Sequence, residues 1–285
     1  MPSKKSAKLK KTSFLIYNLN ILLHILTKKS FTSEDVKNKY ESKTVVDSFE
    51  PQIVLQKPER AVLDELMNKL PEMKMLDIGV GAGRTSLHFA PLVKEYVGID
   101  YSTSMIEICR RKYPHLKFEV ADAKKMVSFR DAYFDFVLFS FNGLDSVEHE
   151  DRLQILREIR RITKTQGFFC FSSHNMNSFQ HSPIKASKNA FTTLENIHMI
   201  LVAIFLNLRA RKIFLYPSLS NGYFMFYHGH ANVLFKTYFV SPVEQRKQLR
   251  DAGFVVAKIY GLDGREIKNT ADEVDDWLYF LCRPG

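Results

Sequence analysis

The sequence predicts an α/β fold, with a mostly parallel sheet of seven strands, helices on both faces of the sheet and an inserted α+β cap. Two observations carry this prediction. Short apolar runs alternate with amphipathic segments of helical spacing from about residue 60 onward, and a glycine-rich turn at 79–83 joins the first apolar run to the helix that follows. Alternation of this kind builds parallel strands joined by right-handed crossovers.

The elements follow in order along the chain. Apolar runs of strand length predict strands at 73–78, 96–99, 116–120, 134–139 and 168–172. Apolar residues at helical spacing predict the intervening helices at 60–70, 85–92, 104–112 and 151–162. After an interruption, a helix begins with Ser241 as its N-cap and Pro242 in its first turn. The last strands, at 254–260 and 277–282, are expected to pair like a hairpin at the end of the sheet.

This order predicts a domain organisation. Residues 59–174 and 241–285 are expected to form one domain, residues 1–58 to hold a basic arm and N-terminal helices, and residues 175–240 to form the cap. Within the cap, two aromatic-rich runs at 222–228 and 233–240 flank a turn that contains glycine, which predicts a hairpin.

Composition bounds the class of protein. The 285 residues are 45% hydrophobic and 25% charged, as in an ordinary globular protein. The mixture argues against a largely disordered chain or a small disulfide-rich scaffold. The three cysteines, Cys109, Cys170 and Cys282, have no C-x-x-C spacing of the kind that zinc sites use. They fit a reducing compartment, and we expect a cytoplasmic location.

The net charge of +10 is concentrated in two segments. Residues 1–12 carry five lysines and no acid, and the predicted cap is basic as well. A basic arm is most often a solvated tail, but it can also attract a nucleic acid or an anionic membrane surface. The apolar run at 14–26 is too short to span a membrane. We favour a helix packed on the domain there over a membrane-surface anchor, and we expect a second helix at 197–208.

The glycine turn carries the chemistry. Gly79-x-Gly81-x-Gly83 follows the first strand, Asp77 lies at the end of that strand, and Asp100 ends the second one. Glycines let a backbone turn tightly and approach a ligand closely. An acid before them would repel a pyrophosphate and suits a positively charged ligand instead. A carboxylate at the end of the second strand can accept the hydroxyls of a ribose.

With these residues the sequence resembles the class I S-adenosylmethionine-dependent methyltransferase family. The resemblance rests on five motifs in order: Asp77-x-Gly79-x-Gly81-x-Gly83, Val97–Ser102, Phe118–Ala123, Phe134–Val137 and the turn near Gly167. It covers 73–173 well and 241–282 loosely. Where the family usually has Pro-Gly-Gly, this chain has Thr165-Gln166-Gly167, a departure that affects a turn. The resemblance implies a Rossmann-like fold, an enzyme, and S-adenosylmethionine as its cofactor, with S-adenosylhomocysteine as product.

The resemblance also implies which residues bind the cofactor. The glycines would approach its methionine part, and the acids would hold its ammonium, ribose and adenine in turn. Tyr101 and Met105 would flank the adenine ring. The alternative for these two side chains is plain packing in the core. The residues after the fourth strand would border the sulfonium. The full set is Asp77, Gly79, Gly81, Gly83, Asp100, Tyr101, Met105, Asp122, Ala123, Ser140, Phe141 and Asn142.

The acceptor side is less determined. A hydroxyl acceptor needs a general base, and candidates are His228 and His230 in the predicted hairpin and His174 at the end of the fifth strand. For the hairpin histidines, hydrogen bonding within a turn is the alternative. Candidate substrate residues are Asn142, Asn175, Tyr223 and Tyr227. Nothing in the spacing singles out a metal site, so no metal is expected.

Three functions follow from this sequence. The favoured one is methyl transfer to an oxygen or nitrogen atom of a small-molecule acceptor, because an aromatic cap suits an enclosed site. The basic residues of the cap suggest an anionic acceptor. The second is methyl transfer to RNA, protein or lipid gripped by the arm and cap, with a peripheral membrane association as one form of it. The third is a binding module without activity. The sequence leaves the oligomeric state open.

Overall fold

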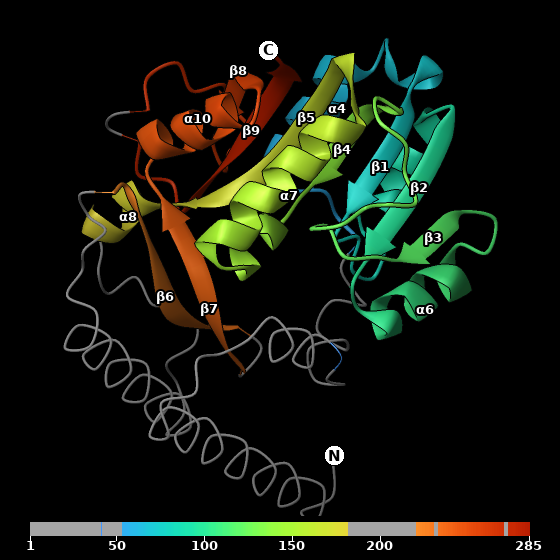
Figure 1. Cartoon of the computed structure of the whole chain (residues 1–285), viewed down its shortest axis with the longest axis horizontal. Coiled ribbons are helices and arrows are strands. Elements are labelled where there is room, and N and C mark those ends of the chain that lie inside the picture. Colours follow the sequence, from blue (N-terminus) through green and yellow to red (C-terminus); the bar gives the residue numbers. More distant parts are fainter. Residues whose placement is uncertain (1–40, 42–52, 182–220, 231–232, 271–272) are drawn as a thin grey trace, which may run out of the picture. The chain divides into compact units, whose positions relative to one another are not determined.

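A computed structural model describes residue 41 and residues 53–181, 221–230, 233–270 and 273–285. Its centre is a nine-stranded sheet in which the first seven strands have the order β3-β2-β1-β4-β5-β7-β6 (Figure 1). The remaining pair follows β5, because β9 pairs with β5 and β8 pairs with β9. The strands are β1 (Lys74–Ile78), β2 (Glu95–Asp100), β3 (Lys117–Val120), β4 (Phe134–Phe139), β5 (Thr163–Asn175), β6 (Tyr223–His230), β7 (Val233–Val240), β8 (Phe254–Tyr260) and β9 (Trp277–Pro284).

The ladders make the sheet mostly parallel. The neighbours from β3 to β5 are all parallel, whereas β9 lies antiparallel to both β5 and β8. This arrangement confirms the predicted Rossmann-like fold with its hairpin-like pair at the end. One feature differs from the expectation of seven strands. The hairpin predicted within the cap is present as β6 and β7, but it extends the central sheet, because β7 pairs with β5 in parallel through His174 and Asn175.

Helices cover both faces of the sheet. They are α4 (Lys57–Leu66), α5 (Ser86–Phe89), α6 (Thr103–Lys112), α7 (His149–Ile162), α8 (Met176–His181) and α10 (Pro242–Asp251). Two of them begin with a serine whose hydroxyl accepts a backbone N–H three residues on: Ser102 at α6 and Ser241 at α10. Such caps satisfy N–H groups that a helix cannot pair by itself. The predicted start at Ser241 is therefore confirmed.

The strands bury side chains on both sides, as a parallel sheet between helical layers must. Val137 and Phe169 face one core with Ile155 of α7 and Leu249 of α10. The alternate strand side chains, such as Phe136, Leu138 and Cys170, face a second core. There they pack with helix residues of α4, α5 and α6: Leu63, Phe89 and Ile106. Figure 1 shows α7 in front of the sheet and α4 behind it.

Several predictions concern residues outside the described ranges. They are the basic arm at 1–12, the helices expected at 14–26 and 197–208, and most of the cap. Among the helices of the described ranges, none is both long and apolar enough to span a membrane.

Candidate functional site

A pocket lies at the carboxyl ends of the parallel strands, where α/β sheets bind ligands. It spans about 940 Å³ of space, a figure that includes open solvent. Nine of the predicted cofactor residues line it: Asp77, Gly79, Gly81, Asp100, Tyr101, Met105, Ala123, Ser140 and Phe141. Strand ends β1, β2 and β4 and the turn after β1 therefore bring together residues that are far apart in the sequence.

The glycine turn has the shape that the sequence implies. Gly79, Gly81 and Gly83 all have positive φ angles, of 63°, 54° and 82°. A Cβ atom on Gly79 would lie 2.8 Å from the ring of Phe139, whereas one on Gly81 would meet no atom within 4 Å. Gly81 therefore leaves open space beside the pocket. Gly83 packs against the Tyr113 ring, which a Cβ would approach to 2.7 Å, and does not line the pocket.

Asp100 is fixed by two backbone amides. Its Oδ2 accepts a hydrogen bond from the N–H of Gly81 at 2.9 Å, and its Oδ1 accepts one from the N–H of Ser102 at 2.9 Å. Burial raises the pKa of the carboxyl to about 6, although these amides oppose the rise. The carboxylate thus links the glycine turn to the end of β2 and faces the pocket.

Asp77 lies beneath the same turn and is 1% exposed. Its Oδ2 accepts hydrogen bonds from the hydroxyls of Thr85 at 2.6 Å and Tyr96 at 2.8 Å. Burial raises the pKa of this carboxyl to about 6 as well, against the effect of the two hydroxyls. The pocket therefore contains two buried carboxyl groups that lack a strong cationic partner and gain from a ligand that supplies donors or positive charge.

Besides Gly83, two more predicted cofactor residues lie outside the pocket lining. Asp122 is exposed, and its Oδ1 accepts the N–H of Lys124 at 2.8 Å. Asn142 follows Phe141 and adopts a left-handed conformation with φ 59°, and its N–H donates to the hydroxyl of Ser172 at 2.7 Å. The Oδ1 atom of Asn142 is buried and finds no hydrogen-bond partner among the residues that the structure describes.

The structure adds a buried charged cluster that the sequence did not reveal. Glu59 of α4 is 1% exposed and forms a two-pronged ion pair with the guanidinium of Arg84, with Oε1 2.7 Å from Nη2. The hydroxyls of Ser140 and Tyr279 also donate to this carboxylate. Arg84 directly follows the glycine turn and lines the pocket. The place of Arg84 next to the glycine turn was the one sequence signal that could have predicted this cluster. Glu59 gave no such signal, because its partners come from distant elements.

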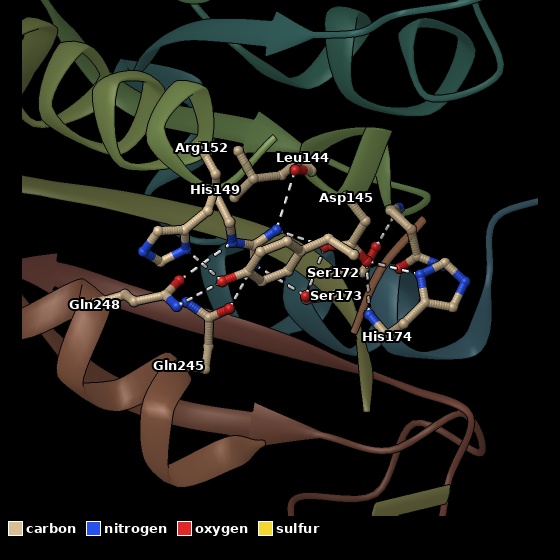
Figure 2. Close-up of polar contacts among 11 residues, drawn as sticks. Leu144, Asp145, His149, Arg152, Ser172, Ser173, His174, Gln245 and Gln248 are labelled. Atoms are coloured by element: carbon tan, nitrogen blue, oxygen red, sulfur yellow. Dashed lines mark hydrogen bonds and ion pairs between the residues drawn. The ribbon is translucent and has the colours of Figure 1, made fainter. Parts of the chain in front are cut away.

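A second buried network stands beside the pocket rim (Figure 2). Its centre is Arg152 of α7, which is fully buried and lies 4.6 Å from the centre of the Tyr238 ring. Its guanidinium pairs with Asp145 of the short 3₁₀ helix Gly143–Ser146, at 2.5 Å. Its other hydrogen bonds go to oxygens on the same 3₁₀ helix, on β5 and on α10: Leu144 O, Ser173 Oγ, Gln245 Oε1 and Gln248 Oε1.

His174, a predicted catalytic residue, belongs to this network. Its Nδ1 lies 2.7 Å from Oδ2 of Asp145, and its backbone N–H donates to the same oxygen. Burial alone would raise the pKa of the Asp145 carboxyl, but the Arg152 charge and the His174 hydrogen bonds hold it below its usual value. Asp145 is therefore an ionised acceptor that orients the imidazole.

The other predicted acceptor-side residues are spread out. The amide of Asn175 donates to the backbone of Glu273 and Asp275, and its Oδ1 accepts the N–H of Asn177, so its polar atoms hold the chain together. Tyr223 stacks on His149 with ring centres 4.1 Å apart. For Tyr227, His228 and His230 only the backbone in β6 is described, and their roles stay predictions.

Comparisons with known proteins agree with this geometry. Residues 75–167 match a family model described as a methyltransferase domain. The match begins in β1, includes the glycine turn and Asp100, and ends within β5. The predicted resemblance to class I S-adenosylmethionine-dependent methyltransferases is thereby confirmed.

Individual relatives point the same way. A demethylmenaquinone methyltransferase of Streptomyces avermitilis is 36% identical over 106 residues, which are 36% of this chain and 44% of the relative. The match thus spans less than half of that relative. A solved S-adenosylmethionine-dependent methyltransferase from Clostridium acetobutylicum is similar with a TM-score of 0.54 and 12% identity, over 87% of this chain and 98% of the other.

A second solved structure, 1,6-didemethyltoxoflavin-N1-methyltransferase from Burkholderia thailandensis, was determined with 1,6-didemethyltoxoflavin and S-adenosylhomocysteine bound. It is similar with a TM-score of 0.52 and 15% identity, over 88% of this chain and 86% of the other. At these identities the two structural likenesses show the fold.

The network around Arg152 yields a stability prediction. We expect Arg152→Met to lower the free energy of unfolding by about 3–5 kcal/mol, because it strips a buried carboxylate of its main counter-charge. Arg250→Met is the matched control, since the Arg250 side chain is 72% exposed and should cost under ~0.5 kcal/mol. Urea unfolding followed by circular dichroism measures both. Equal stability of the two variants would show that the buried pair contributes nothing.

Proposed function

We propose that this chain is an S-adenosylmethionine-dependent methyltransferase that transfers a methyl group to an oxygen or nitrogen atom of a small-molecule acceptor. One observation carries the proposal. Within the region that matches a methyltransferase domain, the buried carboxylate of Asp100 is held by the amides of Gly81 and Ser102 at the wall of an open pocket. A carboxylate so placed can accept both hydroxyls of a ribose.

The residues of the pocket fit this cofactor. The open space beside Gly81 admits a ligand close to the backbone. Ile99, Met105 and Ala123 offer apolar surface for an adenine ring, and the buried carboxyl of Asp77 suits an ammonium group. Arg84 adds a cation to the same wall. The pocket thus holds complements to each part of a molecule that is at once aromatic, hydroxylated and zwitterionic.

When bound, S-adenosylmethionine supplies a methyl group already activated by a positively charged sulfur. The task of the chain is to align the acceptor atom with that methyl group and to exclude water. Phe139, Phe141 and Gly143 line the rim beside Ser140 and are suited to that task. Phe139 ends β4 and the others follow it within four residues, so the sheet itself fixes their position.

Two observations bear on the acceptor. The relative from Streptomyces avermitilis and the similar structure from Burkholderia thailandensis both bear the names of enzymes for small molecules, which supports a small-molecule acceptor here. Most of the basic residues that favour an anionic acceptor lie at 182–220, outside the described residues. The anionic character of the acceptor is therefore supported by the sequence alone.

The direct test uses purified protein and S-adenosylmethionine with a labelled methyl group. The mixture is incubated with cell extract divided into small-molecule, lipid, RNA and protein fractions. We expect label in the small-molecule fraction, where mass spectrometry identifies the product. Label only in the other fractions would refute the small-molecule acceptor, and the absence of both label and S-adenosylhomocysteine binding would refute the methyltransferase.

Asp100→Asn tests the cofactor site. We expect this variant to bind S-adenosylhomocysteine about 10- to 100-fold more weakly, because hydrogen bonds to a charged group contribute about 1.5–3 kcal/mol. Asp131→Asn is the control, since the Asp131 side chain is 77% exposed and is not among the residues that line the pocket. Isothermal titration calorimetry measures both dissociation constants. Unchanged binding in Asp100→Asn would remove the ribose role.

The raised pKa values of Asp77 and Asp100 predict a pH dependence. In the free protein both carboxyls take up a proton below about pH 6, so their contribution to stability is complete below about pH 4 and is lost as the pH rises through 6. Ligand binding needs the ionised forms. We therefore expect S-adenosylhomocysteine to bind about fourfold more weakly per carboxyl at pH 5.5 than at pH 7.5.

Calorimetry at several pH values measures this dependence. Asp77→Asn serves as the internal comparison, because it removes one of the two titrating groups and should reduce the pH effect by about half on a logarithmic scale. An affinity that does not vary between pH 5.5 and 7.5 would show that neither carboxyl must be ionised for binding.

A further inference from the structure

The hydroxyl of Tyr96 reaches the buried carboxyl of Asp77 from the neighbouring strand. Tyr96 of β2 is paired with Met75 of β1, two residues before Asp77, so the side chains of Tyr96 and Asp77 share a face of the sheet. The residue of β2 directly opposite Asp77 is Gly98, which has no side chain. The phenol extends along the strand, and its oxygen lies 2.8 Å from Oδ2 of Asp77. The sheet thus places a hydroxyl donor from β2 beside a carboxyl group of the pocket.

The ring of Tyr96 is held by apolar packing. The residue is 7% exposed, and its ring packs edge-on against Phe118, with ring centres 6.2 Å apart. It belongs to the same core as Met75 and Ile106. A phenylalanine at this position would keep these contacts, so the role of the hydroxyl can be separated from that of the ring.

The hydrogen bonds around this hydroxyl run in one direction. An ionised carboxylate only accepts, so the single hydroxyl proton of Tyr96 is donated to Asp77. The oxygen of Tyr96 then accepts from the hydroxyl of Ser86 in α5, which lies 2.7 Å away and is fully buried. A directed chain therefore leads from Ser86 through Tyr96 to Asp77. Successive hydrogen bonds of this kind polarise and strengthen one another.

The two oxygens of the Asp77 carboxyl have different surroundings. Oδ2 accepts from both the Thr85 and the Tyr96 hydroxyls. None of the described residues donates to Oδ1, and Asp77 lines the pocket. The two hydroxyls therefore hold the carboxylate through one oxygen and leave the other to a ligand.

The charges around Asp77 come from several elements. Arg84 favours the ionised carboxylate and Glu59 of α4 opposes it, and these two residues pair with each other. The other titratable groups at this wall are Asp100 of β2 and the thiol of Cys109 on α6. Burial raises the pKa of Cys109 to about 12, so the thiol stays neutral at physiological pH. The hydroxyls are thus the direct hydrogen-bonding support of the ionised form.

We propose that Tyr96 is a positioning residue of the cofactor site, whose hydroxyl keeps the Asp77 carboxylate ionised and turned so that Oδ1 meets the ammonium group of the cofactor. The inference rests on the proposed function and adds a residue that does not itself line the pocket. A donor to the ionised form favours that form over the protonated one. Loss of the hydroxyl therefore raises the pKa of Asp77 further above its value of about 6.

The test is the pH dependence of S-adenosylhomocysteine binding in Tyr96→Phe, measured by isothermal titration calorimetry. A hydrogen bond to a carboxylate corresponds to about one pKa unit. The dissociation constant of the variant relative to the wild type should therefore be within about twofold of one at pH 8.5 and rise to about eightfold at pH 5.5. Asp100 titrates in both proteins, so its effect cancels from this ratio. A hydroxyl that only stabilised the fold would change the ratio equally at every pH.

Tyr133→Phe is the matched control. The hydroxyl of Tyr133 also donates to a carboxylate, that of Glu95 at 2.8 Å, but neither residue lines the pocket. We expect this variant to bind S-adenosylhomocysteine like the wild type at both pH values. Combined with Asp77→Asn, Tyr96→Phe should have no pH-dependent effect, because the group on which it acts is gone.

Ser86→Ala is a second variant that leaves Tyr96 in place and removes the donor to its oxygen. The directed chain predicts the same trend at smaller size, with a ratio of about twofold at pH 5.5. A ratio that does not vary with pH in Tyr96→Phe would overturn the proposal, and Ser86→Ala decides in the same way if Tyr96→Phe does not fold. A pH effect that persists in the Asp77→Asn background would also overturn it. If S-adenosylhomocysteine does not bind the wild type, the proposed function fails instead, so the two failures are distinguishable.

Discussion

The buried ion pair between Arg152 and Asp145 is the interaction on which the arrangement of the acceptor side depends. A guanidinium can be removed from water only if its charge and its donors are satisfied. Here the partners come from the 3₁₀ helix Gly143–Ser146, from β5 and from α10, and the Tyr238 ring of β7 covers the face of the guanidinium. Satisfying one side chain therefore fixes the rim of the pocket against β5 and the hairpin. The same pair keeps Asp145 ionised, which gives His174 its orientation.

The cofactor side uses buried charge in the opposite way. Asp77 and Asp100 are buried beside hydroxyls and amides. Arg84, the one cation among the described residues that line the pocket, is engaged by Glu59. The raised pKa values of the two aspartates record the cost of leaving them without a full partner. A ligand that brings hydroxyl donors and an ammonium group recovers that cost on binding. The acceptor side is therefore held rigid because its buried charges are fully paired. The cofactor side is ready to bind a ligand because its buried carboxyl groups are not.

This contrast explains what could be predicted from the sequence. The parallel sheet, the glycine turn, Asp77 and Asp100 could be predicted because each follows from a short sequence pattern of neighbouring residues. Arg152 and Glu59 were not found because several of their partners are far away in sequence, as in the hydrogen bond that joins Arg152 to Gln245. The hairpin was predicted, but its place beside β5 was not, because only two residues of β5 pair with it. Asp122 was expected at the pocket from its motif, yet its carboxylate faces solvent.

The division also accounts for where the match to the family model ends. The match to a methyltransferase domain stops at residue 167, before the carboxyl end of β5. His174, Trp277 and the hairpin all lie beyond that point. A cofactor shared by many enzymes constrains the turn that binds it, since the same ribose and the same methionine part must be met by the same backbone. The acceptor differs from enzyme to enzyme, so the residues that meet it are free to come from different strands. The chemistry particular to this chain should therefore be sought in the part outside the family-model match.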